Sequence, residues 1–149
     1  KGALGFSQSI PQEDKNLYTK QELESQIMVL MAGRLSEQLF LDNITNGAYD
    51  DIEKLNQIAY NVIADFGMNK KIGFRKIYSK QQSYWRKESD TLVSELDKEI
   101  DLLLKDLEQK TIKILESNKE TISDIKELLI EKETIDYNDI DIIVTNKNQ

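Results

Sequence analysis

The chain of 149 residues contains neither cysteine nor histidine, and these two absences exclude several kinds of chemistry. Without cysteine it has no disulfides, no thiolate metal site and no thiol nucleophile. Without histidine it has no imidazole general base and no nitrogen ligand of the kind that zinc enzymes use. The residues of this chain alone therefore cannot form a catalytic zinc site.

Proline, basic residues and long apolar runs are also scarce. A single proline among many Leu, Ile, Glu and Lys residues predicts one mainly α domain that is long enough to bury a core. The net charge of −7 argues against nucleic-acid binding. No apolar run approaches the roughly 20 residues that span a bilayer, and the N-terminus lacks the layout of a signal peptide. The chain begins with Lys1 rather than Met, which suggests a piece of a longer protein.

A short edge strand is predicted in residues 1–11. Leu4, Phe6 and Ile10 are apolar and are separated by small or polar residues, and this period of two is typical of a half-buried strand. Pro11 would end the strand. From the residues alone, an ordinary edge strand is the simplest interpretation.

A helical core is predicted in residues 19–73. Thr19 and Glu22 have the spacing of a capping box, so a helix should start there and continue to about Phe40. A second helix should start near Ala48 and stop at Gly67, a residue type suited to the left-handed turn after a helix. The predicted core positions of these two helices recur mostly every three or four residues: Leu23, Ile27, Leu30, Met31, Leu35, Leu39, Ile52, Leu55, Ile58, Ala59, Val62, Ile63 and Phe66.

The C-terminal half is predicted to be a helical hairpin with a short last helix, in residues 89–144. Ser89 can cap a long helix whose apolar residues follow a near-heptad rhythm from Leu96 to Ile114. Such a stripe packs on another helix, and a capping signal at Thr121 favours an antiparallel hairpin over a coiled-coil dimer. Residues 76–88 show no periodicity and are predicted to be a mobile loop, and residues 145–149 a polar tail.

Asp51 is the candidate site residue that the pattern itself singles out. If the second helix starts near Ala48, Asp51 projects in the same direction as Leu55 and Val62, which should face the core. A carboxylate there needs a partner, such as a metal, a cation or backbone N–H groups. The alternative is that Asp50 and Asp51 are first-turn acids that complement the helix dipole.

Several blocks of the sequence resemble, in the same order, those of the FtsH-type AAA zinc metalloproteases. The most telling are Gly-Ala-Tyr-Asp-Asp-Ile at 47–52, Ala-Tyr at 59–60 and the run Phe-Gly-Met-Asn-Lys-Lys-Ile-Gly at 66–73. Ala-Gly-Arg-Leu-Ser-Glu at 32–37 and Glu-Lys-Glu-Thr-Ile-Asp at 131–136 add to the resemblance. It covers nearly the whole chain and is strongest to the mitochondrial m-AAA, or paraplegin-like, branch. Ala32, Ser36 and Asn46 depart from the family pattern.

The resemblance implies roles for particular residues. Asp51 matches the third zinc ligand of the family, and Glu37 matches a glutamate that would lie near the metal and orient a ligand by a hydrogen bond. The alternative for Glu37 is an exposed helix acid that pairs with Arg34. Ala3, Leu4, Gly5 and Phe6 match the edge strand beside the active-site cleft, where an extended substrate can add as a further strand.

The resemblance also implies the kind of protein to which the chain belongs. The family is a membrane-anchored hexamer in which an ATPase ring, using ATP and Mg²⁺, threads unfolded polypeptides into a zinc peptidase ring. Its two zinc-binding histidines and catalytic glutamate come from an H-E-x-x-H helix that lies upstream of these residues. This stretch alone would hold no catalytic residue and would be inactive. The mitochondrial inner membrane is the expected location, with a bacterial-type or plastid membrane as the alternative. A non-catalytic helical assembly module is the alternative function.

Overall fold

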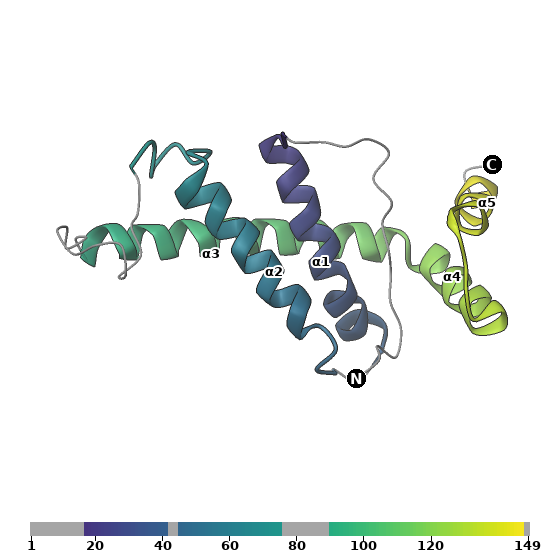
Figure 1. Ribbon diagram of the computed structural model, residues 1–149. Helices are drawn as coiled ribbons and strands as arrows, with labels where there is room; N and C mark the ends of the chain where they lie inside the picture. Colours follow the sequence, from purple (N-terminus) through teal and green to yellow (C-terminus); the bar gives the residue numbers. More distant parts are fainter. Residues whose placement is uncertain (1–16, 42–44, 76–89, 148–149) are drawn as a thin grey trace.

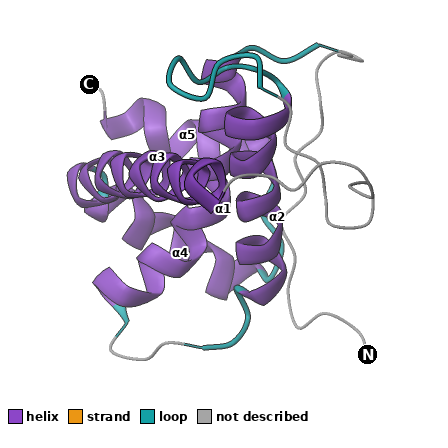
Figure 2. Ribbon diagram, turned by 90° about the vertical axis from the view of Figure 1, so that its left-hand side faces the viewer, coloured by secondary structure: helices purple, strands orange, loops and turns teal. Residues whose placement is uncertain are grey.

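A computed structural model of the chain describes residues 17–41, 45–75 and 90–147, and all of its regular structure in these ranges is helical (Figure 2). The predicted mainly α class is thereby confirmed. The predicted strand at 1–11 and the predicted mobile loop at 76–88 lie outside the described residues. The elements are α1 (Lys20–Phe40), α2 (Tyr49–Tyr60), the π-helical segment η1 (Asn61–Asp65), α3 (Asp90–Ser117), α4 (Lys119–Lys132) and α5 (Tyr137–Lys147).

The capping box predicted at the start of α1 is confirmed. Thr19 Oγ1 accepts a hydrogen bond from the Glu22 backbone N–H at 3.2 Å, and the Glu22 carboxylate accepts one from the Thr19 backbone N–H at 2.8 Å. Two backbone donors that a helix start leaves unpaired are satisfied in this way. The helix then runs to Phe40, where it was predicted to end.

α1, α2 and α3 bury their apolar faces against one another. Figure 1 shows α1 and α2 side by side, both crossing the long α3 obliquely. The buried residues form two clusters, one with Leu23, Val62, Ile63, Ala64, Ile72 and Leu96, the other with Ile27, Leu55, Ala59 and Leu107. Both α1 and α3 contribute to both clusters, α1 through Leu23 and Ile27 and α3 through Leu96 and Leu107, and α1 packs closely on both of the other helices.

The α2 helix widens into a π-helical turn at η1. The Phe66 N–H donates to the Asn61 carbonyl at 2.9 Å, which is the i→i−5 bond of a π-turn. Three consecutive residues are buried here: Val62, Ile63 and Ala64. The 3.6-residue period of an α-helix would not place three consecutive residues on one apolar face. The predictions that Leu39, Ile52 and Phe66 belong to the core are wrong, because these residues are 36%, 44% and 51% exposed.

The apolar stripe of α3 packs on α1 and α2 rather than on the helix that follows it. Leu96 and Leu107 of this stripe are buried in the two clusters, whereas Ile114 near its end is exposed. The antiparallel pair at the C-terminus is formed by α4 and α5, which lie beyond the end of α3 in Figure 1. A stripe identifies a face that must be covered, but it does not identify the helix that covers it.

α4 and α5 are joined by ion pairs at both ends. Lys132 lies 2.6 Å from Asp139, and Lys147 lies 3.2 Å from Glu120 and 2.9 Å from Asp124. Lys147 shows that α5 continues into the segment predicted as a polar tail. The start of α4 also differs from the prediction at Thr121. The helix begins at Lys119, and Asn118 alone separates it from α3.

Among the described helices, none combines the length and the apolar character that crossing a lipid bilayer requires.

Gly67 ends the α2–η1 helix in the left-handed conformation that was predicted, with φ of 63°. Replacing Gly67 with alanine should lower the free energy of unfolding by about 1–2 kcal/mol, because L-residues disfavour this conformation. The added Cβ would also lie 3.2 Å from the Phe74 ring. Urea denaturation of the 149-residue chain measures the loss.

Gly33→Ala is the matched control for the change at Gly67. Gly33 lies inside α1, and a Cβ there meets nothing within 4 Å. Alanine should raise stability at this position by up to about 1 kcal/mol, because it is the better helix former. Equal effects of the two substitutions would contradict the conformational argument.

Candidate functional site

The predicted site residues Glu37 and Asp51 lie on either side of the connection between α1 and α2. Glu37 is in the last turn of α1, and Asp51 is in the first turn of α2. The two helices run antiparallel, so the end of one and the start of the other meet at the same edge of the molecule (Figure 1). Among the described residues, Glu37 and Asp51 make no hydrogen bond to each other.

Glu37 binds the turn that leads into α2. Its Oε2 accepts a hydrogen bond from the Thr45 backbone N–H at 3.1 Å, and its Oε1 accepts one from the Thr45 hydroxyl at 2.9 Å. Arg34, one helical turn earlier, donates from Nη1 to the Thr45 carbonyl at 2.6 Å and lies 3.5 Å from Glu37 Oε2. All three polar groups of Thr45 are therefore bonded to α1.

The electrostatics of this contact favour the charged form of Glu37. The backbone N–H and the hydroxyl of Thr45, with the Arg34 guanidinium beside them, hold the pKa of the Glu37 carboxyl below its ordinary value. Glu37 is thus a carboxylate at neutral pH, and both of its oxygens are engaged by Thr45. The predicted ion pair with Arg34 is present, and it is one part of a larger contact.

The Thr45 hydroxyl also shapes the start of α2. It accepts a hydrogen bond from the Gly47 N–H at 3.3 Å while it donates to Glu37. The residue at the N-cap position, Ala48, is buried and offers no side-chain hydrogen bond. Since α2 lacks a side-chain cap, the contacts of Thr45 and the bond from the Tyr49 N–H to the Asn46 carbonyl at 3.3 Å fix the chain just before the helix.

Asp51 lies at the edge of the buried face of α2. Its side chain is half-buried, one turn before the buried Leu55, whereas Asp50 beside it is exposed. Asp51 makes no hydrogen bond or ion pair with the described part of the chain. Asp51 therefore lies beside the core, as its spacing to Leu55 predicted, and it is also a first-turn acid of α2, as the alternative predicted. Its role as a ligand stays a prediction.

The side chains that can donate a ligand atom determine how much of a zinc site this chain can supply. Carboxylate oxygens are accepted zinc ligands, and Asp51 can provide one. Four-coordinate zinc needs further ligands, and the chain has no histidine or cysteine to offer. No group of three acidic side chains that could hold a metal ion occurs among residues 17–41, 45–75 and 90–147. The residues present fit one position of a zinc site, and the other ligands must come from another segment.

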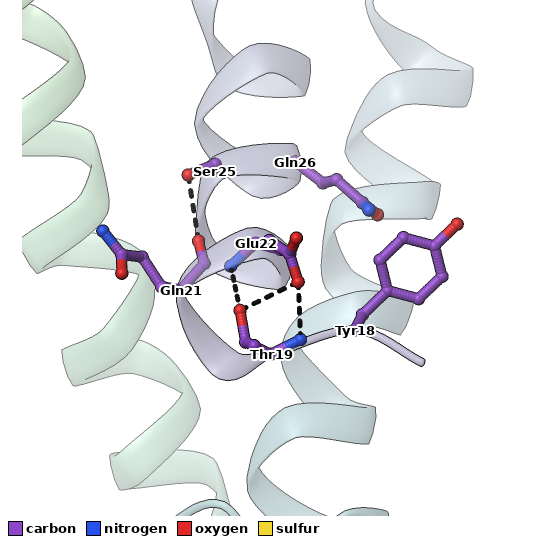
Figure 3. Close-up of a pocket in the computed structure, with 6 residues that line it drawn as sticks. All are labelled: Tyr18, Thr19, Gln21, Glu22, Ser25 and Gln26. Carbon is purple, nitrogen blue, oxygen red and sulfur yellow. Dashed lines mark hydrogen bonds between the residues drawn. The ribbon is translucent and has the colours of Figure 1, made fainter. Parts of the chain in front are cut away.

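Two hollows of the described surface are lined by neither Glu37 nor Asp51. One surrounds the capping box at the start of α1 and is lined by Tyr18, Thr19, Gln21, Glu22, Ser25 and Gln26 (Figure 3). Since α1 rises about 1.5 Å per residue, this polar pocket is roughly 25 Å along the helix from Glu37. The other is an apolar groove between α1 and α2, lined mainly by Val29, Leu30 and Ile58.

The predicted substrate strand, with Ala3, Leu4, Gly5 and Phe6, lies outside the described residues. Arg34 and Thr45 were not singled out as site residues by the sequence. The three-residue spacing of Arg34 and Glu37 was the available signal, but it predicted a pair on one helix. The partner that both residues share is eight or more positions away, which helical spacing does not predict.

Comparison with known proteins gives the same family along the whole chain. The sequence profile of peptidase family M41 matches residues 1–143. The ATP-dependent zinc metalloprotease FtsH of Clostridium perfringens is 35% identical over 139 residues, which are 90% of this chain and 19% of that protein. The FtsH of Ruminiclostridium cellulolyticum is 30% identical over 152 residues, 97% of this chain and 25% of that protein.

A eukaryotic relative matches equally well. The mitochondrial inner membrane m-AAA protease component AFG3L2 of Mus musculus is 36% identical over 140 residues, which are 92% of this chain and 17% of that protein. The identity of this chain to the mouse mitochondrial relative is therefore one percentage point higher than its identity to the FtsH of Clostridium perfringens. The chain spans about a fifth of the length of the curated relatives that it matches.

Proposed function

Because the chain belongs to peptidase family M41, the FtsH-type zinc metalloproteases, we propose that it forms part of the peptidase domain of an ATP-dependent zinc metalloendopeptidase. In this proposal Asp51 is the third zinc ligand. The observation that carries it is the half-buried carboxylate of Asp51, which has no partner in the described part of the chain and stands at the start of a helix. The histidine ligands and the catalytic base would come from an H-E-x-x-H helix upstream.

Each candidate residue has a task that follows from its chemistry. Zinc, when bound, would activate a water molecule for attack on the peptide bond. Asp51 would complete the ligand set with an oxygen, and Glu37 would support this ligand from α1. Ala3, Leu4, Gly5 and Phe6 would bind an extended stretch of an unfolded polypeptide through main-chain hydrogen bonds. This stretch alone would not cleave peptides.

The assembly and location of the whole protein are also proposals. We propose a homo- or hetero-hexamer, anchored in a membrane, whose ATPase domain uses ATP and Mg²⁺ to deliver substrates. The name of the mouse relative supports the mitochondrial inner membrane, and the bacterial relatives support a bacterial-type membrane, with a plastid membrane as a further alternative. No nucleic acid is expected as a partner, given the net charge of −7.

The alternative function is a non-catalytic helical module that assembles with other chains. Such a module is either an inactive relative of the proteases or an unrelated interaction domain that uses the apolar stripe of α3. For the second kind, Leu96 and Leu107 of this stripe are buried against α1 and α2. Dimerisation through this face would have to expose the core of the domain. The internal packing of α3 therefore counts against dimerisation through this stripe, but an inactive relative with the same fold would pack in the same way, and only the metal analysis separates the two functions.

Metal analysis of the full-length protein tests the proposed role of Asp51. Replacing Asp51 with alanine should remove most of the bound zinc, because a site that loses one of its protein ligands binds the ion more weakly. Asp50→Ala is the matched control: it removes the neighbouring first-turn acid, with the same effect on the helix dipole, and should leave zinc bound.

Two results of the metal analysis would count against the proposal. Equal zinc content in the wild-type protein and in Asp51→Ala would remove Asp51 from the ligand set. A full-length wild-type protein that holds no zinc would favour the non-catalytic alternative.

A further inference from the structure

The contact between α1 and the turn at Thr45 has a consequence for the metal ligand. We propose that Arg34, Glu37 and Thr45 form a positioning clamp that fixes where α2 begins and so sets how tightly Asp51 holds zinc. The inference rests on the proposed role of Asp51. It assigns functions to Arg34 and Thr45, and it specifies that Glu37 acts through Thr45.

The first argument is the completeness of the contact. The N–H, the carbonyl and the hydroxyl of Thr45 are each bonded to a side chain of α1, at 3.1, 2.6 and 2.9 Å. Thr45 is exposed, so these bonds are not needed to satisfy a buried group. Hydrogen bonds to charged side chains are stronger than neutral ones, and both partners here are charged. The contact therefore holds one residue of the turn in a single position against α1.

The second argument is that the start of α2 has no side-chain cap. A typical helix start is defined by a capping side chain, as Thr19 defines the start of α1. At α2 the N-cap residue is Ala48, which has no side-chain hydrogen bond. In the turn before the helix, the Gly47 N–H donates to the Thr45 hydroxyl at 3.3 Å and the Tyr49 N–H donates to the Asn46 carbonyl at 3.3 Å. The clamp thus replaces a cap, and the chain needs only six residues to pass from Thr45 to Asp51.

The third argument is the chemistry of a zinc site. A ligand must be held within about 0.5 Å of its productive position, and groups that orient ligands change metal affinity typically by about 10–100-fold when they are removed. Both oxygens of Glu37 accept from Thr45, so this carboxylate acts on the ligand through the turn. Arg34 and Thr45 are thus positioning residues of the same kind, although neither touches the metal.

The test measures zinc release from the full-length protein into a chromogenic chelator, together with the visible spectrum of the cobalt-substituted protein. Thr45→Val and Glu37→Ala should each speed zinc release by about 10–100-fold and shift the cobalt spectrum, because the coordinating carboxylate is displaced. Thr45→Ser keeps the hydroxyl and should behave as the wild type. Glu24→Ala, which removes another ion pair of α1, the one with Lys20, should also behave as the wild type.

The controls separate failure of the clamp from failure of the proposed function. Wild-type zinc release and cobalt spectrum in Thr45→Val and Glu37→Ala would overturn the clamp, and so would a Thr45→Ser protein as impaired as Thr45→Val. If Asp51→Ala, measured beside them, keeps its zinc, the ligand assignment itself is wrong. Circular dichroism checks folding, and Thr45→Val keeps the test decisive if Glu37→Ala unfolds, because the Thr45 side chain is exposed.

Discussion

Replacing Asp51 with alanine in the full-length protein is expected to lower the rate of peptide-bond hydrolysis by at least about 100-fold. Loss of a group that only orients a ligand costs up to about 100-fold in such sites, and loss of the ligand itself should cost no less. The activated water depends on the bound ion, so a site that loses zinc loses its nucleophile. Cleavage of a fluorescently labelled unfolded protein measures the rate.

ATP hydrolysis in the same Asp51→Ala protein separates loss of chemistry from loss of assembly. ATP turnover should be unchanged, because the proposed ATPase domain lies outside this stretch and Asp51 is at the edge of the peptidase core. Asp50→Ala should cleave the substrate at the wild-type rate. Undiminished cleavage by Asp51→Ala would refute the assignment, whereas loss of both activities would indicate damage to the fold or to the proposed assembly.

The start and end of α1 and the mainly α fold were predictable because they depend on local pattern. A capping box involves residues three positions apart, and the apolar stripe from Leu23 to Leu35 follows the helical period. Leu23, Ile27 and Leu35 are buried as this stripe requires. The left-handed turn at Gly67 is local in the same sense, since it depends on one residue type at the end of one helix.

The covering of α3 was not predictable from its own sequence. Its near-heptad stripe suits a hairpin, a dimer or a layer of other helices, and all three bury the same residues. The structure uses α1 and α2 for this purpose. Thr111 of α3 is buried as well, and its hydroxyl is satisfied by donating to the Leu107 carbonyl at 2.7 Å. The choice of partner depends on how much apolar surface each helix presents, which is a property of the whole chain.

One part of the candidate site was predictable from local pattern, and another part was not. The position of Asp51 beside the core follows from its four-residue spacing to Leu55, and it was predicted. The hydrogen bonds between Thr45 and the side chains of Glu37 and Arg34 depend on how α1 and α2 approach each other, and only the structure shows them. Periodicity can therefore single out a candidate ligand such as Asp51, whereas the groups proposed to position it are found only in the tertiary fold.

The second large expected effect is a loss of stability on disrupting the core cluster that contains Leu55, the buried residue one turn after Asp51. Ile27 is fully buried in the cluster with Leu55, Ala59 and Leu107, which joins α1, α2 and α3. Ile27→Ala should lower the free energy of unfolding by about 2–5 kcal/mol, through lost burial and the cavity that remains. Urea denaturation of the 149-residue chain measures it. This is a large share of the about 5–15 kcal/mol that stabilises a typical domain.

Val29→Ala is the matched control, since Val29 is two positions further along α1 and 70% exposed. Its effect should stay within about 0.5 kcal/mol, as for most surface substitutions. Leu107→Ala should share part of its cost with Ile27→Ala, because the two residues belong to one cluster and coupled sites deviate from additivity by about 0.5–3 kcal/mol. If the losses of stability from Ile27→Ala and Leu107→Ala simply add in the double variant, the cluster does not pack as one cooperative unit. If it is one, the same packing that holds Leu55 also holds Asp51, one turn before it, at the edge of the core.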